Sequence, residues 1–191
     1  MTDLLTGAGP FLYPLAFCSA LATFIIFERL FALRRGVVLP SQERNAFFAG
    51  HLDVLAVSDS VAGRIAAFAQ QKETDAPQLQ AYARLQISGL ERGLFVLDIV
   101  TSAAPLLGLL GTVTGLVRVF AQISPETGLP DPGSFVEGVA LALSTTMIGL
   151  AIAIPALAFA AYLHRRVDMY AAELGVGVER LVALKEAGAT R

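Results

Sequence analysis

Three long stretches without a charged residue limit the folds open to this chain more than any other feature. They cover residues 10–27, 99–117 and 138–163. A helix needs about 20 apolar residues to cross the ~30 Å hydrocarbon core of a bilayer, and each stretch approaches or exceeds that length. Hydrophobic residues make up 55% of the chain and charged residues only 16%. The sequence therefore predicts an all-α integral membrane protein with three transmembrane helices.

The positions of the basic residues predict how these helices are oriented. Arg29, Arg34 and Arg35 follow the first stretch, and Arg165 and Arg166 follow the third. Cytoplasmic flanks of membrane helices are enriched in Lys and Arg, so we expect the N-terminus outside and the C-terminus in the cytoplasm. The expected segments are an external N-terminus (1–9), transmembrane helix 1 (10–33), a small cytoplasmic helical domain (34–92), transmembrane helix 2 (93–121), a short external loop (122–134), transmembrane helix 3 (135–163) and a cytoplasmic C-terminal helix and tail (164–191).

Local signals predict several helices in the cytoplasmic segment. Pro40-Ser41-Gln42 is typical of a helix start, with a stop at Gly50. Ser60 is placed to cap a helix over 61–71, and Asp75-Ala76-Pro77 opens another. The sequence contains no proline between Gln78 and Pro105. We therefore expect this last helix to run from the cytoplasm directly into the membrane.

The second apolar stretch carries a stripe of small and weakly polar residues. Its members recur at steps of four and three, which places them on one helical face. They are Thr101, Pro105, Gly108, Thr112 and Gly115. Lipid does not require such a face, whereas a neighbouring helix or a narrow polar path would.

The third stretch repeats the pattern and adds three consecutive hydroxyls. Its small face consists of Gly138, Ala142, Thr145, Gly149 and Ala153, and the hydroxyls belong to Ser144, Thr145 and Thr146. One interpretation is packing alone, with each hydroxyl bonded to a carbonyl of its own helix. The other is that Thr112 and one of Thr145 or Thr146 line a polar path for a small ion.

No ionisable residue lies in the middle of a predicted membrane helix. Asp98 is near the inner end of the second helix, Arg118 is near its outer end, and Glu137 is near the outer start of the third. Arg118 and Glu137 are placed either to pair across the short loop or to reach the lipid headgroups separately. If the chain carries protons, it lacks a membrane carboxylate of its own, which points to a partner that supplies one.

Several other functions find no support in the sequence. No GxxxxGKS/T, GxSxG or HExxH motif occurs, and Cys18 is the only cysteine. The net charge is −2, without a basic patch. We therefore expect no enzymatic activity, no cofactor, no metal site and no nucleic-acid partner.

Two blocks of sequence resemble the MotA/TolQ/ExbB proton-channel family, nearest its ExbB and TolQ branches. The blocks are residues 104–113 with Gly115, and residues 142–150 with 153–156. The resemblance implies a homopentamer whose second and third helices surround a pore. Inside it would sit a dimer of an ExbD/TolR-type single-span protein that carries a membrane aspartate. Leu141 stands where many members of the family carry a glutamate.

The resemblance also implies roles for individual residues. Thr112 and Thr146 match the pore threonines of the family. Thr145 stays a candidate for the ion pathway from the run of hydroxyls alone. Helix packing and partner contact are expected of Pro105, Gly108, Gly111, Gly115, Gly149 and Pro155, and Asp98, Arg118 and Glu137 are possible interfacial charges.

The implied function is proton-driven energy transduction in the bacterial inner membrane. The complex would power TonB-dependent transport through a TonB- or TolA-like protein that spans the periplasm. The alternatives are a TolQ-like subunit for envelope maintenance or division, another stator-type motor, and a non-conducting oligomeric scaffold.

Overall fold

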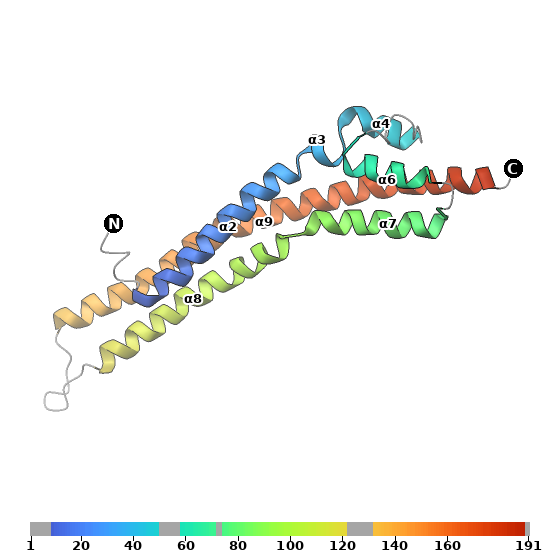
Figure 1. Ribbon diagram of the computed structural model, residues 1–191. Coiled ribbons are helices and arrows are strands. Elements are labelled where there is room, and N and C mark those ends of the chain that lie inside the picture. Colours follow the sequence, from blue (N-terminus) through green and yellow to red (C-terminus); the bar gives the residue numbers. More distant parts are fainter. Residues whose placement is uncertain (1–8, 50–57, 72–73, 122–131, 190–191) are drawn as a thin grey trace. The chain divides into compact units, whose positions relative to one another are not determined.

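The computed structural model describes residues 9–49, 58–71, 74–121 and 132–189 (Figure 1). In this part of the chain every regular element is a helix. The elements are η1 (Gly9–Phe11), α2 (Leu12–Ala32), α3 (Arg35–Val38), α4 (Ser41–Ala49), α6 (Val61–Ala69), α7 (Ala76–Ser88), η2 (Gly89–Glu91), α8 (Leu94–Ala121) and α9 (Pro132–Ala189). Three helical segments are long and apolar enough to cross a membrane, namely Leu12–Ala32, Ala76–Ala121 and Phe135–Ala187. The prediction of an all-α protein with three helices long and apolar enough to span a membrane is confirmed for the described residues.

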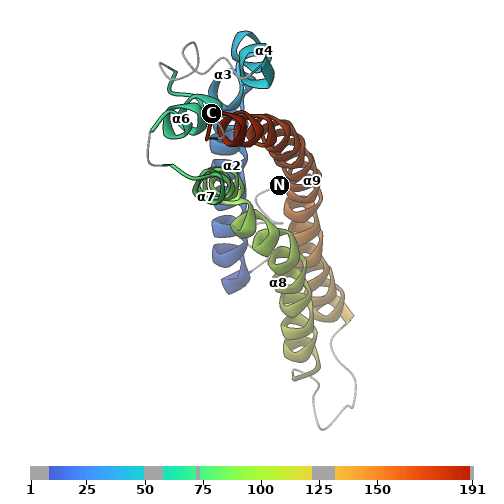
Figure 2. The ribbon, with the colours of Figure 1, turned by 90° about the vertical axis from the view of Figure 1, so that its right-hand side faces the viewer.

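The chain divides into two compact units, each described here by itself. Unit 1 comprises residues 1–26 and 95–160, and unit 2 comprises residues 27–94 and 161–191. In unit 1, α2, α8 and the first part of α9 run side by side (Figures 1 and 2). The α2 residues buried here, Leu15, Cys18, Ala22 and Ile25, recur at steps of three and four. Large apolar side chains cover the outside, among them Phe17, Phe24, Leu106 and Ile154. Such an exterior suits a hydrocarbon environment.

In unit 2 the predicted helix starts are confirmed. Helix α4 begins at Ser41. Ser60 caps α6 by accepting a 2.9 Å hydrogen bond from the Gly63 amide, and its hydroxyl donates to Glu43 at 2.6 Å. At the start of α7, the Gln78 side chain accepts from the Asp75 amide at 3.2 Å. These caps satisfy backbone donors that the first helical turn leaves without partners.

The expectation of one continuous helix from Gln78 into the membrane is wrong. Helix α7 ends at Ser88, the short η2 follows, and α8 begins only at Leu94. Gly93 takes a φ of +88°, a left-handed conformation that only glycine adopts readily. The side chain of Arg29 lies against it, 3.4 Å from the position that a Cβ would occupy. A glycine conformation, rather than a proline, interrupts the helix here.

Helix α9 also differs from the expected boundaries. It begins at Pro132, inside the predicted loop 122–134, because proline suits the first turn of a helix. Residues 122–131 of that loop lie outside the described residues. The helix then passes His164, Arg165 and Arg166 without a break.

Long-range hydrogen bonds hold α9 to its neighbours in unit 2. The Tyr170 hydroxyl donates to the Leu33 carbonyl at 3.0 Å, just past the end of α2. The Lys185 ammonium donates to the carbonyls of Ala69 at 2.8 Å and Gln71 at 3.1 Å, at the end of α6. Both side chains satisfy carbonyls that the last helical turn leaves without partners.

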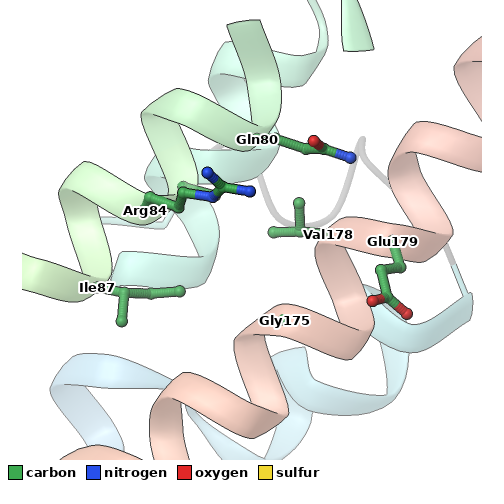
Figure 3. A pocket seen from close by; sticks show the side chains of 7 residues that line it. Gln80, Arg84, Ile87, Gly175, Val178 and Glu179 are labelled. Atoms are coloured by element: carbon green, nitrogen blue, oxygen red, sulfur yellow. The ribbon is translucent and has the colours of Figure 1, made fainter. Parts of the chain in front are cut away.

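A cavity of about 190 Å³ lies between α7 and α9 in unit 2. Gln80 and Arg84 extend into it from α7, and Val178 points into it from α9 (Figure 3). Arg84 and Glu179, which also lines it, are exposed. The cavity is thus an open surface feature.

Candidate functional site

Helix α8 lies beside the first part of α9 in unit 1 (Figure 2). The two small-residue stripes meet in this contact. A Cβ added to Gly108 would lie 2.8 Å from the Thr145 carbonyl oxygen and 2.9 Å from Thr146 Cα. One added to Gly149 would lie 2.5 Å from the Ala104 carbonyl oxygen. Each glycine therefore touches the backbone of the other helix, and the helices are closer than any larger side chain permits.

Two further glycines of α8 continue this contact. A Cβ on Gly111 would lie 2.6 Å from Thr145 Oγ1, and one on Gly115 would lie 2.6 Å from the Ala142 Cβ. The packing role predicted for Gly108, Gly111, Gly115 and Gly149 thus has a direct geometric basis. The close approach of α8 and α9 is possible because small residues face each other at the same level on both helices.

The hydroxyls of Thr112 and Thr146 meet across this contact. They are hydrogen-bonded to each other, and either oxygen is able to act as donor. Thr112 Oγ1 also lies 3.2 Å from the Gly108 carbonyl oxygen and 3.1 Å from that of Ala142. One hydroxyl proton cannot serve three acceptors at once, so Thr112 does not donate in all three of these contacts at the same time. Both side chains are only half-buried.

Thr145, the neighbour of Thr146, is placed differently. Its side chain is 2% exposed and lies inside the helix contact. Its hydroxyl is within bonding distance of the Gly108 carbonyl oxygen at 3.0 Å and that of Ala142 at 2.7 Å. Ser144 is also buried and donates to the Ala140 carbonyl at 3.0 Å. The burial of Thr145 favours the packing interpretation for this residue.

The predicted interfacial charges lie outside the hydroxyl cluster. Asp98 is half-buried in the first turns of α8, where Thr101 and Ser102 donate to its backbone carbonyl at 2.8 and 3.1 Å. Arg118 and Glu137 are both exposed, and the structure gives no ion pair between these two described residues. The proposed pairing across the loop is therefore not formed.

The two helix prolines are also separate from the cluster. Pro105 is half-buried in α8, and Pro155 is exposed in α9. Because proline has no N–H, each leaves the carbonyl four residues earlier without its helical donor. Pro155 lines a cavity of about 160 Å³ between α2 and α9. Sequence reasoning missed this cavity, although the hydroxyls in the first apolar stretch and the proline in the third were a signal.

The chemistry available at the α8–α9 contact is that of neutral hydroxyls. They accept and donate hydrogen bonds but do not ionise near neutral pH. No cluster of His, Cys, Asp or Glu suited to a metal occurs among the described residues. The site is thus suited to pass or orient a proton or a water molecule, and not to hold a charge by itself.

Comparison with known proteins finds one protein family and several similar proteins from bacteria. The model of the MotA/TolQ/ExbB proton channel family matches residues 43–175. The biopolymer transport protein exbB1 of Vibrio cholerae is 32% identical over 184 residues, covering 87% of this chain and 80% of that protein. The biopolymer transport protein ExbB of Helicobacter pylori is 37% identical over 93 residues, covering 48% and 63%. That of Aquifex aeolicus is 35% identical over 96 residues, covering 50% and 64%.

Proposed function

Because this chain belongs to the MotA/TolQ/ExbB proton channel family, we propose that it is the pore-forming subunit of a proton-driven complex in the bacterial inner membrane. The observation that carries the proposal is the hydrogen-bonded pair Thr112 and Thr146. The pair lies within apolar spans, where a polar group is costly unless it forms a hydrogen bond. It offers a proton relay whose two oxygens come from two different helices.

The proposal requires a second protein that supplies the titrating group. Residues 99–117 and 138–163 contain no Asp, Glu, Lys or Arg. Hydroxyls alone cannot store a proton near neutral pH, so a carboxylate must come from elsewhere. We assign it to a dimer of an ExbD/TolR-type single-span protein that bears a membrane aspartate.

In this mechanism a proton passes between the aspartate of the partner and the hydroxyls of Thr112 and Thr146. A membrane potential supplies about 2.3 kcal/mol per charge for each 100 mV, enough for a stepwise mechanical cycle. A homopentamer of this chain would surround the partner dimer, with Pro105 and Pro155 allowing α8 and α9 to flex. Movement of the dimer would then act on a TonB- or TolA-like protein and power TonB-dependent transport.

The test is proton flux into vesicles that hold this chain together with its partner. The double variant Thr112→Val and Thr146→Val keeps the volume of both side chains but removes both hydroxyls. We expect flux to fall at least about ten-fold, a barrier increase of roughly 1.4 kcal/mol. The double serine variant keeps both hydroxyls and should retain flux.

Thr114→Val provides a matched control on the same helix. The Thr114 hydroxyl donates only to the Leu110 carbonyl of its own helix, at 2.8 Å. Flux should be unchanged in this variant. Full flux in the double valine variant would remove both threonines from the path. No flux from the wild-type complex would instead favour the non-conducting scaffold.

Within the family, two assignments remain to be separated by phenotype. Loss of TonB-dependent uptake after deletion of the gene would support the ExbB-like role. Intact uptake with a leaky envelope or a division defect would support the TolQ-like role. A neighbouring gene for a single-span protein with a membrane aspartate would identify the partner.

A further inference from the structure

The cavity between α2 and α9 in unit 1 is built from both apolar and polar groups. It has a volume of about 160 Å³. Ser19 and Thr23 line it from α2, Ala151 and Pro155 line it from α9, and the remaining walls are apolar. All of these residues lie within uncharged stretches of the sequence. We refer to this space as the α2–α9 cavity.

Pro155 leaves one backbone carbonyl at this cavity without its usual donor. In an α-helix the carbonyl of residue 151 accepts from the amide of residue 155, but proline has no amide proton. Ala151 is itself a wall of the cavity, and it is exposed. A bare carbonyl in hydrocarbon is costly, because lipid tails offer no hydrogen bond.

Helix α2 brings two hydroxyls to the same cavity. Thr23 Oγ1 donates to the Ser19 carbonyl at 2.8 Å and keeps its lone pairs available. The Ser19 hydroxyl has no hydrogen-bond partner among the described residues, and its side chain is half-buried. The cavity therefore combines a freed acceptor, a free hydroxyl and a second hydroxyl oxygen.

We propose that the α2–α9 cavity is a hydrated site inside the membrane, where a few water molecules donate to the Ala151 carbonyl and bond to the Ser19 and Thr23 hydroxyls. A water molecule occupies about 30 Å³ in the liquid and needs two to four polar partners, so both the volume and the chemistry suffice. Water at this point lets α9 flex at Pro155, because the Ala151 carbonyl keeps a partner in every conformation. The proposal depends on membrane insertion and not on ion conduction.

Cysteine labelling tests whether the cavity is wet. A methanethiosulfonate reagent attacks the thiolate, which forms only where water reaches the sulfur. In a Cys18→Ala background, Ser19→Cys places a thiol in the cavity. Phe17→Cys places one on the outer face of α2, where Phe17 is 67% exposed. The full chain is reconstituted in phosphatidylethanolamine and phosphatidylglycerol vesicles.

We expect Ser19→Cys to react at least about ten-fold faster than Phe17→Cys, because the reactive thiolate forms only where water reaches the sulfur. Equal rates at the two positions would overturn the proposal, whether both were slow or both fast. The role of the carbonyl is tested by adding Pro155→Ala, which returns an amide donor to Ala151. Labelling of Ser19→Cys should then slow, whereas Pro105→Ala on α8 should leave it unchanged. If labelling stayed fast with Pro155→Ala, the Ala151 carbonyl would not be what binds the water.

Discussion

Threonine hydroxyls in this protein occupy two different environments only one residue apart. Thr145 and Thr146 are consecutive, so their side chains leave α9 about 100° apart. That rotation buries Thr145 between the helices and leaves Thr146 half-buried beside Thr112. Residue type alone therefore does not decide which hydroxyl is available to an ion. The direction of each side chain does.

This difference predicts separate consequences for Thr145. Thr145→Val removes the hydrogen bond to the Gly108 carbonyl and keeps the shape of the side chain. Interhelical hydrogen bonds in membranes contribute about 0.6 kcal/mol on average, so the thermal midpoint in detergent should fall by only a few degrees. Circular dichroism measures the midpoint, and Thr145→Ser should recover it. Proton flux should persist, and its loss in a fully assembled variant would place Thr145 in the ion path.

At the scale of elements, the contact between α8 and α9 depends on glycines that touch backbone. Gly149→Ala and Gly108→Ala each bring a methyl group within 3 Å of backbone atoms, which cannot rotate away as a side chain can. Overpacking of this kind costs about 1–3 kcal/mol. We expect each variant to have a lower thermal midpoint and weaker assembly with the partner. Gly89→Ala, with φ −61° and nothing within 4 Å of the new methyl group, should show neither effect.

Two glycines of α9 in unit 2 give a second, sharper comparison. A Cβ on Gly177 would overlap the ring of Phe47, whose side chain is fully buried, whereas a Cβ on Gly175 meets nothing within 4 Å. Gly177→Ala should therefore destabilise the protein by about 1–3 kcal/mol. Gly175→Ala should stabilise it by roughly 0.5–1 kcal/mol, because glycine is a poor helix former. Thermal melts of both variants show whether the midpoint rises or falls. Equal shifts of the midpoint in the two variants would contradict the packing of Phe47 on Gly177.

The elements that sequence predicted are those set by local rules. The three spans follow from uncharged length, the caps of α6 and α7 from Ser60 and Asp75, and the α8–α9 contact from matched small stripes. The interruption before α8 was not predicted, because nothing local distinguishes Gly93 from the many glycines that remain helical. Its conformation is fixed by tertiary packing, with the Arg29 side chain against it.

The same limit explains what sequence missed in the candidate site. The pairing of Thr112 with Thr146 depends on the register between two helices, which periodicity leaves open. The resemblance to a family pointed to Thr112 and Thr146, whereas the run of hydroxyls left Thr145 as an alternative to Thr146. The burial of Thr145 depends on that register. The α2–α9 cavity needs two helices to be brought together, so neither Ser19 nor Pro155 identifies it alone.

At the scale of the whole molecule, the long helix α9 contributes residues to both compact units. Its residues up to Ala160 belong to unit 1, and those from Ala161 onward belong to unit 2. The boundary between the two units along α9 lies close to His164, Arg165 and Arg166. These three residues directly follow the uncharged stretch 138–163. The division found from packing therefore falls near the membrane border predicted from charge.

The distribution of basic residues predicts the orientation, with the N-terminus outside and the C-terminus in the cytoplasm. Of the 14 Lys and Arg residues, only Arg118 lies away from the predicted cytoplasmic side. An impermeant thiol reagent added to spheroplasts tests this through single cysteines in a Cys18→Ala background. Ala121→Cys, at the exposed end of α8, should react. Asn45→Cys in α4 and Ala183→Cys in α9, both also exposed, should react only after the membrane is opened. The reverse pattern would invert the topology. It would also place the positively charged ends of the spans outside the cell, against the bias that orients membrane helices.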